Sequence, residues 1–422
     1  MNWDNIEKIL GMYTQFKHYQ ILFEKYKLPK KISGKEMFAS LKEQVTNAGF
    51  LEPVISEETF KEWLSYHQID GNNYSYVYYL EKKPRIELLA NLQFKQSELV
   101  KINLWDIDPS NESENIDDVM PNLTDTNLIG IHHDDKLKKY IFSFIAPCVV
   151  TGKNKDGLVR LYKKIFFAHC VLFEESHYCK IVFNPTTNLL NVNGVEKEDR
   201  TDWSPIADLF FSKLQKLIGK QTIKSPNWIP QGLHKLAEEA TNHNNPVIAT
   251  HSFNVEEMVS NFAKKLLEGA DIEVETNTAL HIKLTQDIQQ SFEAQLVEKY
   301  GVIDAENSFS AFRQRSDGVT HLINVESTFG LRQGLAAEAA RRSRTDNDID
   351  LLGIILKTED NMYKFLVECE LHAYSVRGKN TFIEEEVVNI VIRKLNEYRD
   401  EIQSALFNNK ENFTGDPIAS SQ

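Results

Sequence analysis

The stretch Asn347–Ser375 reads NDIDLLGIILKTEDNMYKFLVECELHAYS and predicts a β-hairpin. Two apolar runs flank a short polar segment, which is the pattern of two antiparallel strands joined by a turn. Period-two alternation places Asp348 and Asp350 on one side of the first strand, and Glu368 and Glu370 on one side of the second. The opposite side of the second strand is entirely apolar. The hairpin is therefore expected to bury one side and to carry four carboxylates on the other.

The register of this hairpin decides whether the carboxylates meet. A continuous apolar side requires a turn with an odd number of residues, such as Thr358–Asp360. Asp350 then lies opposite Glu368 and Asp348 opposite Glu370, with Cβ atoms about 4.5–5.5 Å apart. Like charges directly opposite each other are destabilising, so the pairs need a divalent cation, arginines, water or a raised carboxyl pKa.

Hard carboxylate oxygens at this spacing suit Mg²⁺ or Mn²⁺ better than zinc. A magnesium or manganese ion held by Asp350, Glu368 and Asp348 is therefore one prediction for the hairpin. The alternative is a solvent-facing acidic side whose repulsion is relieved by neighbouring arginines.

The order of a helix, a strand with DID, a turn, a strand with VECE and a second helix resembles the core of the PD-(D/E)xK nuclease superfamily, over about residues 307–407. The resemblance implies that Asp350 and Glu368 bind Mg²⁺, and that Glu338 is the auxiliary acid that some members carry. Glu370 stands where the family has a lysine, so it is predicted to be a supporting acid in the catalytic set. An inactive relative is compatible with the same residues.

Basic residues concentrate near this hairpin, although the formal net charge of the chain is −13. Because cationic side chains contact phosphate oxygens, a nucleic-acid substrate would use them. Phosphate binding is predicted for Arg341, Arg342, Arg344, Arg377 and Lys379. The alternative is that these cations, together with Arg313, Arg315 and Arg332, serve as ion-pair partners within the fold.

The length of 422 residues predicts two to four packed units in a multi-domain α+β protein. The expected parts are a helical N-terminal region (1–70), a β-rich domain (71–200), a helical bridging region (201–306), a C-terminal α/β unit with the nuclease-like hairpin (307–407) and a flexible tail (408–422).

Within these parts, residues 85–94 and 100–105 are expected to be strands, and residues 101–136 a solvated acidic linker. Helices are expected at 204–218, 231–241, 255–268 and 286–300. Asn254 and Glu257 resemble a capping box at the start of the third of these helices.

Other signals exclude several protein classes. The four cysteines show no CxxC spacing, which argues against a disulfide scaffold or zinc ribbon. His169, Cys170, His177 and Cys179 fall on one expected hairpin, but neighbouring residues point to opposite faces, so zinc binding is not favoured. The start MNWDNIEKIL has no signal-peptide pattern, and no apolar run approaches the ~20 residues that span a bilayer. A cytoplasmic location without a membrane partner is expected.

The leading functional prediction is a metal-dependent nucleic-acid-processing protein. A β-rich half joined to a nuclease-like half would suit a bacterial antiviral defence or mobile-element system, by analogy of architecture. The alternative prediction is a non-catalytic protein-interaction or assembly subunit that binds a protein partner or forms a homo-oligomer.

Overall fold

A computed structural model describes residues 1–46, 54–110, 115–197, 202–303, 308–318, 321–328, 330–332, 334–345, 348–359, 361–379 and 381–413. The chain forms two compact units. Unit 1 comprises residues 1–226 and 370–389, and unit 2 comprises residues 227–369 and 390–422. Both units combine helices with antiparallel strands, so the predicted multi-domain α+β class is confirmed. The expected boundary between residues 306 and 307 lies inside unit 2.

Unit 1 is built on an antiparallel sheet in which the strand order is β13-β1-β5-β4-β3-β6-β7, with β2 paired to β3 and β8 paired to β1. The strands are β1 (Tyr74–Leu80), β2 (Asn127–Asp134), β3 (Lys139–Lys153), β4 (Val159–Phe173), β5 (Tyr178–Phe183), β6 (Leu189–Val192), β7 (Val195–Glu196), β8 (Ile223–Lys224) and β13 (Tyr374–Gly378). The long β3–β4 pair runs in register from Lys139–Phe173 to Lys153–Val159.

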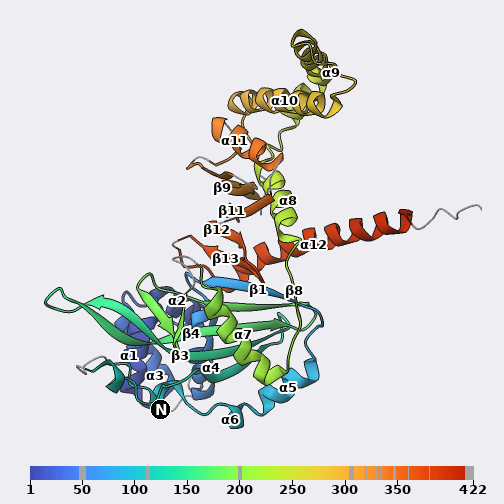
Figure 1. Cartoon of the computed structure of the whole chain (residues 1–422). Coiled ribbons are helices and arrows are strands. Elements are labelled where there is room, and N and C mark those ends of the chain that lie inside the picture. Colours follow the sequence, from blue (N-terminus) through green and yellow to red (C-terminus); the bar gives the residue numbers. More distant parts are fainter. Residues whose placement is uncertain are drawn as a thin grey trace, which may run out of the picture. The chain divides into compact units, whose positions relative to one another are not determined.

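Helices cover both faces of this sheet (Figure 1). They are α1 (Trp3–Tyr13), α2 (Phe16–Lys25), α3 (Gly34–Thr46), α4 (Glu57–Tyr66), α5 (Ile86–Phe94), α6 (Gln96–Leu99) and α7 (Ser204–Ile218), with 3-10 turns η1 (His67–Ile69), η2 (Leu104–Asp106) and η3 (Ile116–Asp118). Alternation along β4 explains the two layers. Ile165 and Phe167 pack with α1–α4, whereas Phe166 and Ala168 pack with α7.

Unit 2 contains a sheet with the strand order β10-β9-β11-β12, formed by β9 (Phe309–Gly318), β10 (His321–Glu326), β11 (Asp348–Lys357) and β12 (Met362–Cys369). Its helices are α8 (Ile229–Thr241), α9 (Pro246–Gly269), α10 (Thr278–Tyr300) and α11 (Gly334–Thr345). α8 packs on β11 and β9, α11 packs on β10 and β9, and α9 pairs with α10 (Figure 1).

The last helix, α12 (Glu385–Phe413), begins in unit 1 and continues among the residues of unit 2. It covers residues 408–413 of the predicted flexible tail, and residues 414–422 lie outside the described range. In the described part of the chain, no helix is both long enough and apolar enough to cross a bilayer.

Several local predictions were wrong. Residues 86–94 form helix α5, because Leu88, Leu89 and Leu92 follow helical spacing, and residues 100–105 form a loop and a 3-10 turn instead of a strand. The expected acidic linker buries Ile107, and also Val119, Met120 and Leu123, in the core under α1–α4. Asn127–Asp134, near the end of the same expected linker, forms strand β2.

The start of the third predicted bridging helix was also wrong. α9 begins at Pro246, eight residues before the expected cap at Asn254. Asn245 is the true N-cap, and its side chain accepts a hydrogen bond from the Val247 N–H at 3.0 Å. Proline at the first helical position suits a helix start because its missing N–H needs no partner there. The resulting helix is long, and its exposed side chains become important below.

Candidate functional site

The predicted acidic hairpin exists, but its register differs by one residue from the expected one. Glu368 pairs with Leu351, and Lys357 pairs with Met362, so the turn holds four residues instead of an odd number. β11 also has a β-bulge in its pairing with β9: Ile349 pairs with Ser316 and Leu351 pairs with Arg315, which leaves Asp350 as the extra residue. The bulge changes which residues share a face.

This bulge lets β11 keep its apolar residues on the covered side of the sheet. Leu352 pairs with Gln314, which lies on the same face of β9 as Ser316, so Ile349 and Leu352 share a face although they are three residues apart. The Gln314 side chain donates to the Ala340 carbonyl at 2.9 Å and thereby fixes this face against α11. Period-two alternation of side chains along a strand does not predict a bulge, so the sequence pattern alone predicted the wrong register.

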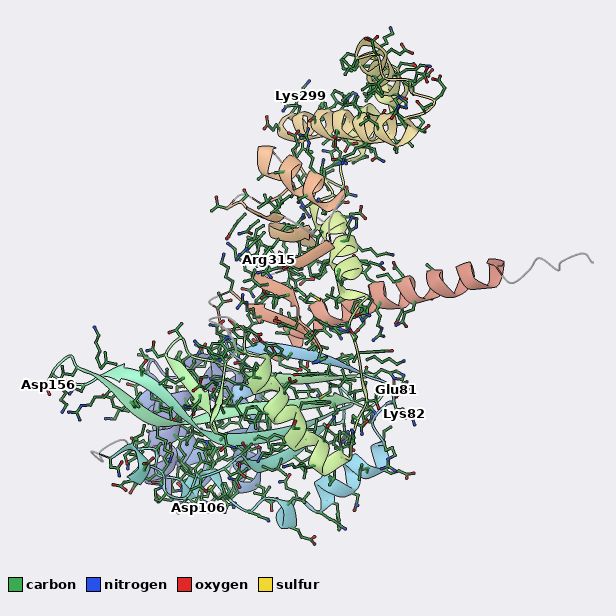
Figure 2. The ribbon with its side chains drawn as sticks, viewed as in Figure 1. Glu81, Lys82, Asp106, Asp156, Lys299 and Arg315 are labelled. Atoms are coloured by element: carbon green, nitrogen blue, oxygen red, sulfur yellow. The ribbon has the colours of Figure 1, made fainter. Side chains whose placement is uncertain are left out.

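A single arginine joins the two principal carboxylates. The Arg315 guanidinium lies 2.7 Å from Asp350 Oδ2 and 2.8 Å from Glu368 Oε1. Figure 2 labels Arg315 among the strands of unit 2. The three side chains are 25%, 28% and 16% exposed, so the attraction is only partly screened by solvent. Arg315 therefore supplies the positive charge that the facing carboxylates require.

Burial still affects the acid at the bulge. Burial raises the pKa of Asp350, and the neighbouring Arg315 guanidinium opposes that rise. Asp350 Oδ1 is buried and has no hydrogen-bond partner among the described residues. The carboxylate is thus held at one oxygen only.

The contacts of Arg315 bear directly on the predicted divalent cation. An ion bridging Asp350 and Glu368 would lie beside the Arg315 guanidinium, which already contacts both carboxylates. Among the described residues, no group of three or more His, Cys, Asp or Glu side chains could hold a metal ion. The side chain of Asp348, the third predicted ligand, lies outside the described part of the structure. Magnesium or manganese binding here remains a prediction that requires Arg315 to move.

The two other predicted catalytic acids have contacts of their own. Glu338, on α11, pairs with Arg342 at 2.8 Å and accepts a hydrogen bond from Ser291 Oγ on α10. Glu370 follows β12 and belongs to unit 1, where its carboxylate accepts from Ser375 Oγ of β13 at 3.4 Å. Glu338 thus contacts the helices of unit 2, and Glu370 contacts a strand of unit 1.

The predicted phosphate-binding cations are divided between the two units, with Arg341, Arg342 and Arg344 in unit 2. Arg344 is 6% exposed and donates to Thr241 Oγ1 at 3.0 Å, and Arg377 lies over the Tyr74 ring in unit 1, 4.9 Å from its centroid. Lys379 also belongs to unit 1. Arg341 and Arg344 line a cavity of about 880 Å³ among α8, α9, α10 and α11. Acidic residues line it as well: Glu238, Glu256 and Glu293.

Removing Arg315 should expose the repulsion that it relieves. We expect Arg315→Ala to lower the free energy of unfolding by about 1–3 kcal/mol at neutral pH, because two facing carboxylates lose their shared donor. Acidification should recover part of this loss, since protonating one carboxyl removes the repulsion. Urea denaturation of both proteins at neutral and mildly acidic pH measures the difference. Arg313→Ala is the matched control on the same strand, and equal losses for both variants would contradict the assignment.

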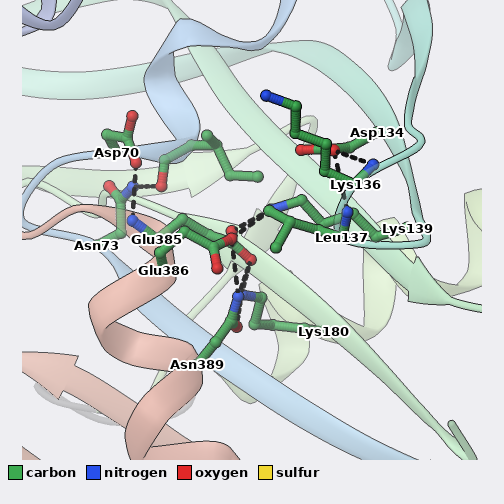
Figure 3. A network of polar contacts seen from close by, with 11 residues as sticks. Asp70, Asn73, Asp134, Lys136, Leu137, Lys139, Lys180, Glu385, Glu386 and Asn389 are labelled. Atoms are coloured by element: carbon green, nitrogen blue, oxygen red, sulfur yellow. Dashed lines mark hydrogen bonds and ion pairs between the residues drawn. The ribbon is translucent and has the colours of Figure 1, made fainter.

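A second polar cluster, in unit 1, was not predicted from the sequence (Figure 3). Lys180 on β5 donates to Glu385 Oε1, and also to Asn389 Oδ1 at 2.7 Å. Lys139 on β3 contacts Glu385 Oε2 at 2.5 Å and Glu386 Oε1 at 2.7 Å. The Lys180 and Glu385 side chains are 0% and 5% exposed. The cluster therefore anchors the first turn of α12 to the strands of unit 1.

The charges of this cluster depend on one another. Burial favours the protonated form of Glu385, but Lys180 and Lys139 hold its pKa well below the ordinary value. Burial lowers the pKa of Lys180, which Glu385 opposes. Burial also opposes the charge of Lys139, yet Glu385 and Glu386 raise its pKa above the ordinary value. Glu385 is therefore the anion on which two buried ammonium groups rely.

Next to this cluster, burial lowers the pKa of His169 to about 3, so the side chain is neutral in the folded protein. Its pKa in the unfolded chain is about 6.5, so the folded state binds fewer protons as pH falls below that value. This ring should therefore contribute a loss of about 2 kcal/mol to the stability of unit 1 between about pH 6.5 and about pH 5. Thermal unfolding at both pH values, beside the natural protein, should show that His169→Gln lacks this contribution.

The pairing of β4 with β5 separates the residues that were considered as a zinc site, because His169 and Cys170 lie on opposite faces of the sheet. Cys170 and Cys179 are buried in the apolar core with α7, whereas His169 forms a hydrogen bond with Ser143 Oγ at 3.1 Å.

Comparison of the chain with protein-family models, with curated proteins and with solved structures finds no match.

Proposed function

We propose that the chain is a non-catalytic assembly subunit that associates with a second copy of itself through helix α9. The observation that carries this proposal is a stripe of exposed apolar side chains along α9. Met258, Phe262 and Leu266 recur every four residues and are 71%, 52% and 46% exposed. Val247, 46% exposed, and the partly exposed Val255 extend the same line. We call these five residues the α9 stripe.

The stripe lies beside the face that α9 uses within its own unit. The buried positions Val259, Ala263 and Leu267 follow Met258, Phe262 and Leu266 by one residue each, which is about 100° around the helix. The internal contact with α10 therefore leaves the stripe exposed. His251 fills the gap between Val247 and Val255, and Lys265, at the same helical angle as Val247, is a charged residue at the edge of the stripe in a chain that is 26% charged. Contiguous exposed apolar patches mark interaction sites.

A second copy is the occupant that fits these features best. A straight helix can pair with its own copy in antiparallel orientation about a two-fold axis, and two-fold homodimers are the commonest soluble oligomers. An axis between positions 258 and 262 would place Met258 of each chain against Phe262 of the other. Leu266 and Val255 would extend the contact, and the aliphatic part of Lys265 would cover its edge.

The predicted acidic site also supports a non-catalytic role. Arg315 engages Asp350 and Glu368, and Arg344 is committed to Thr241 and Ala340 inside unit 2. These contacts give the acids and this arginine a part in stabilising unit 2. A metal-dependent nuclease remains the competing prediction, since a bound substrate and cation could rearrange Arg315.

One experiment separates the two functions. The purified full chain is incubated with plasmid, linear DNA and RNA in Mg²⁺, Mn²⁺ or EDTA, beside the Asp350→Ala/Glu368→Ala variant, and its mass in solution is measured by light scattering. The proposal predicts no metal-dependent cleavage and a mass of twice the 48.7 kDa chain. Cleavage that the variant loses would support the nuclease and contradict the proposal.

A further inference from the structure

Unit 1 contains a small cavity whose lining differs from that of an ordinary core void. Its volume is about 150 Å³, and it is lined by Tyr26, Trp63 and Tyr66 together with Glu62 and Asp70. The other lining residues are His18, Ile21, Leu22, Lys25, Thr59 and His67. Three aromatic residues and two acidic residues thus line one cavity.

The helices explain why these side chains converge. Thr59, Glu62, Trp63 and Tyr66 lie three or four residues apart on α4, so they occupy one side of that helix. Tyr26 is the C-cap residue of α2, which packs in the same helical layer. The rings are held by neighbours: Trp63 is 7% exposed, and Tyr66 stacks on His132 with ring centroids 4.6 Å apart. The cavity wall is therefore preformed.

Asp70 is the buried acid of this cavity. Its Oδ1 accepts a hydrogen bond from the Glu385 N–H at 2.7 Å. Burial raises its pKa to about 7, the Glu385 and Glu384 carboxylates add to this rise, and the Lys139 ammonium opposes it. Glu62 already pairs with His132 at the edge. A cation in the cavity would compensate Asp70.

The histidines and the lysine of the lining do not supply that cation. Burial lowers the pKa values of His18 and His67, so both rings are neutral. The exposed Lys25 ammonium lies 5.7 Å from the Tyr26 ring centroid, at the edge of the cavity. The Lys25 ammonium would repel a cationic ligand, so removing this charge is expected to strengthen the binding of a cation.

We propose that this cavity binds a methylated ammonium group, with Tyr26, Trp63 and Tyr66 around the cation and Asp70 as its counter-ion. Aromatic faces attract cations through their quadrupoles, and a quaternary ammonium is weakly hydrated, so aromatic cages recognise it in preference to other cations. The same group occurs in free small molecules such as choline and in the trimethylated lysine of a peptide. Both sources share the chemistry that the cavity would recognise.

Calorimetric titration of the full chain tests this proposal with tetramethylammonium, choline, a trimethyl-lysine peptide and 3,3-dimethylbutan-1-ol, in which carbon replaces the choline nitrogen. We expect tetramethylammonium and choline to bind at least about tenfold more tightly than the neutral alcohol, because only the cations gain the aromatic and carboxylate attraction. Tighter binding of the peptide than of choline would identify a protein source, and the reverse order a free metabolite.

Matched variants locate the effect in the cavity. Asp70→Asn keeps an oxygen that can accept from the Glu385 N–H, and should weaken choline binding at least about tenfold. Tyr26→Phe should retain binding and Tyr26→Leu should lose it, while Lys25→Met should tighten it by removing the competing ammonium. Unfolding midpoints measured for each variant control for folding. The proposal is overturned if tetramethylammonium does not bind, if the neutral alcohol binds as well as choline, or if Asp70→Asn and Tyr26→Leu bind unchanged.

Discussion

Replacing Glu385 with glutamine is expected to lower the free energy of unfolding of unit 1 by about 3–5 kcal/mol. Glutamine keeps the size of the side chain but removes the charge that pairs with Lys180 and Lys139. Two ammonium groups would then share a buried site with only the half-exposed Glu386 carboxylate and the Asn389 amide as partners. An uncompensated buried charge costs far more than the net value of the pair that held it.

Urea denaturation followed by circular dichroism measures this loss. Glu386→Gln is the matched control, because its carboxylate is 45% exposed and solvent screens its contact with Lys139, so its loss should be under about 1 kcal/mol. The double variant Lys180→Met/Glu385→Leu should recover part of the stability, since it removes one buried cation and the anion together. Equal effects of Glu385→Gln and Glu386→Gln would show that the cluster is not organised around Glu385.

Introducing a carboxylate into the α9 stripe should separate the two chains of the proposed dimer. Phe262→Glu places one charge from each chain at the centre of a two-fold contact, where each would be desolvated next to Met258 of the partner. We expect the dissociation constant to rise at least about a hundredfold, equivalent to about 2.7 kcal/mol. Because Phe262 is 52% exposed, the variant should keep the fold of the monomer. Sedimentation velocity over a range of concentrations measures the change.

The same helix supplies the control for this variant. Phe253 is 75% exposed and lies nine residues before Phe262, which is half a turn away around the helix. Phe253→Glu therefore makes the same chemical change on the opposite side of α9 and should leave the dissociation constant unchanged. If both variants weaken association equally, the contact does not lie along the stripe.

Much of the architecture follows from periodicity that is visible in the sequence. The helix Ser204–Ile218 matches its predicted bounds, because Ile206, Phe210, Leu214 and neighbouring residues form a complete apolar stripe. The two strands of the acidic hairpin were also predicted, because apolar runs and a polar turn are local signals. Local signals fix the type of an element more reliably than its end, as the early start of α9 at Pro246 illustrates.

The candidate site depended on contacts that no local pattern contains. The bulge at Asp350 arises from pairing with β9, and β9 itself was not predicted as a strand. The sequence places Arg315 in a group of basic residues near the hairpin, but it does not show that Arg315 joins Asp350 to Glu368. Lys139 and Glu385 are 246 residues apart in the chain, so their buried pairing could emerge only from the tertiary structure. Arg313 and Arg315 are two residues apart, so they would lie on one side of a strand. This spacing was the one sequence signal that could have suggested an arginine next to Asp350 and Glu368.

Sedimentation equilibrium of the full natural chain measures the proposed association through α9. The net charge of −13 repels two copies at low salt, and the screening length falls from about 30 Å at 0.01 M to about 8 Å at 0.15 M. We expect a mass of twice 48.7 kDa that becomes more dominant as salt rises, because apolar contact persists while repulsion is screened. A mass of one chain at every salt and protein concentration would show that the chain does not associate in this way.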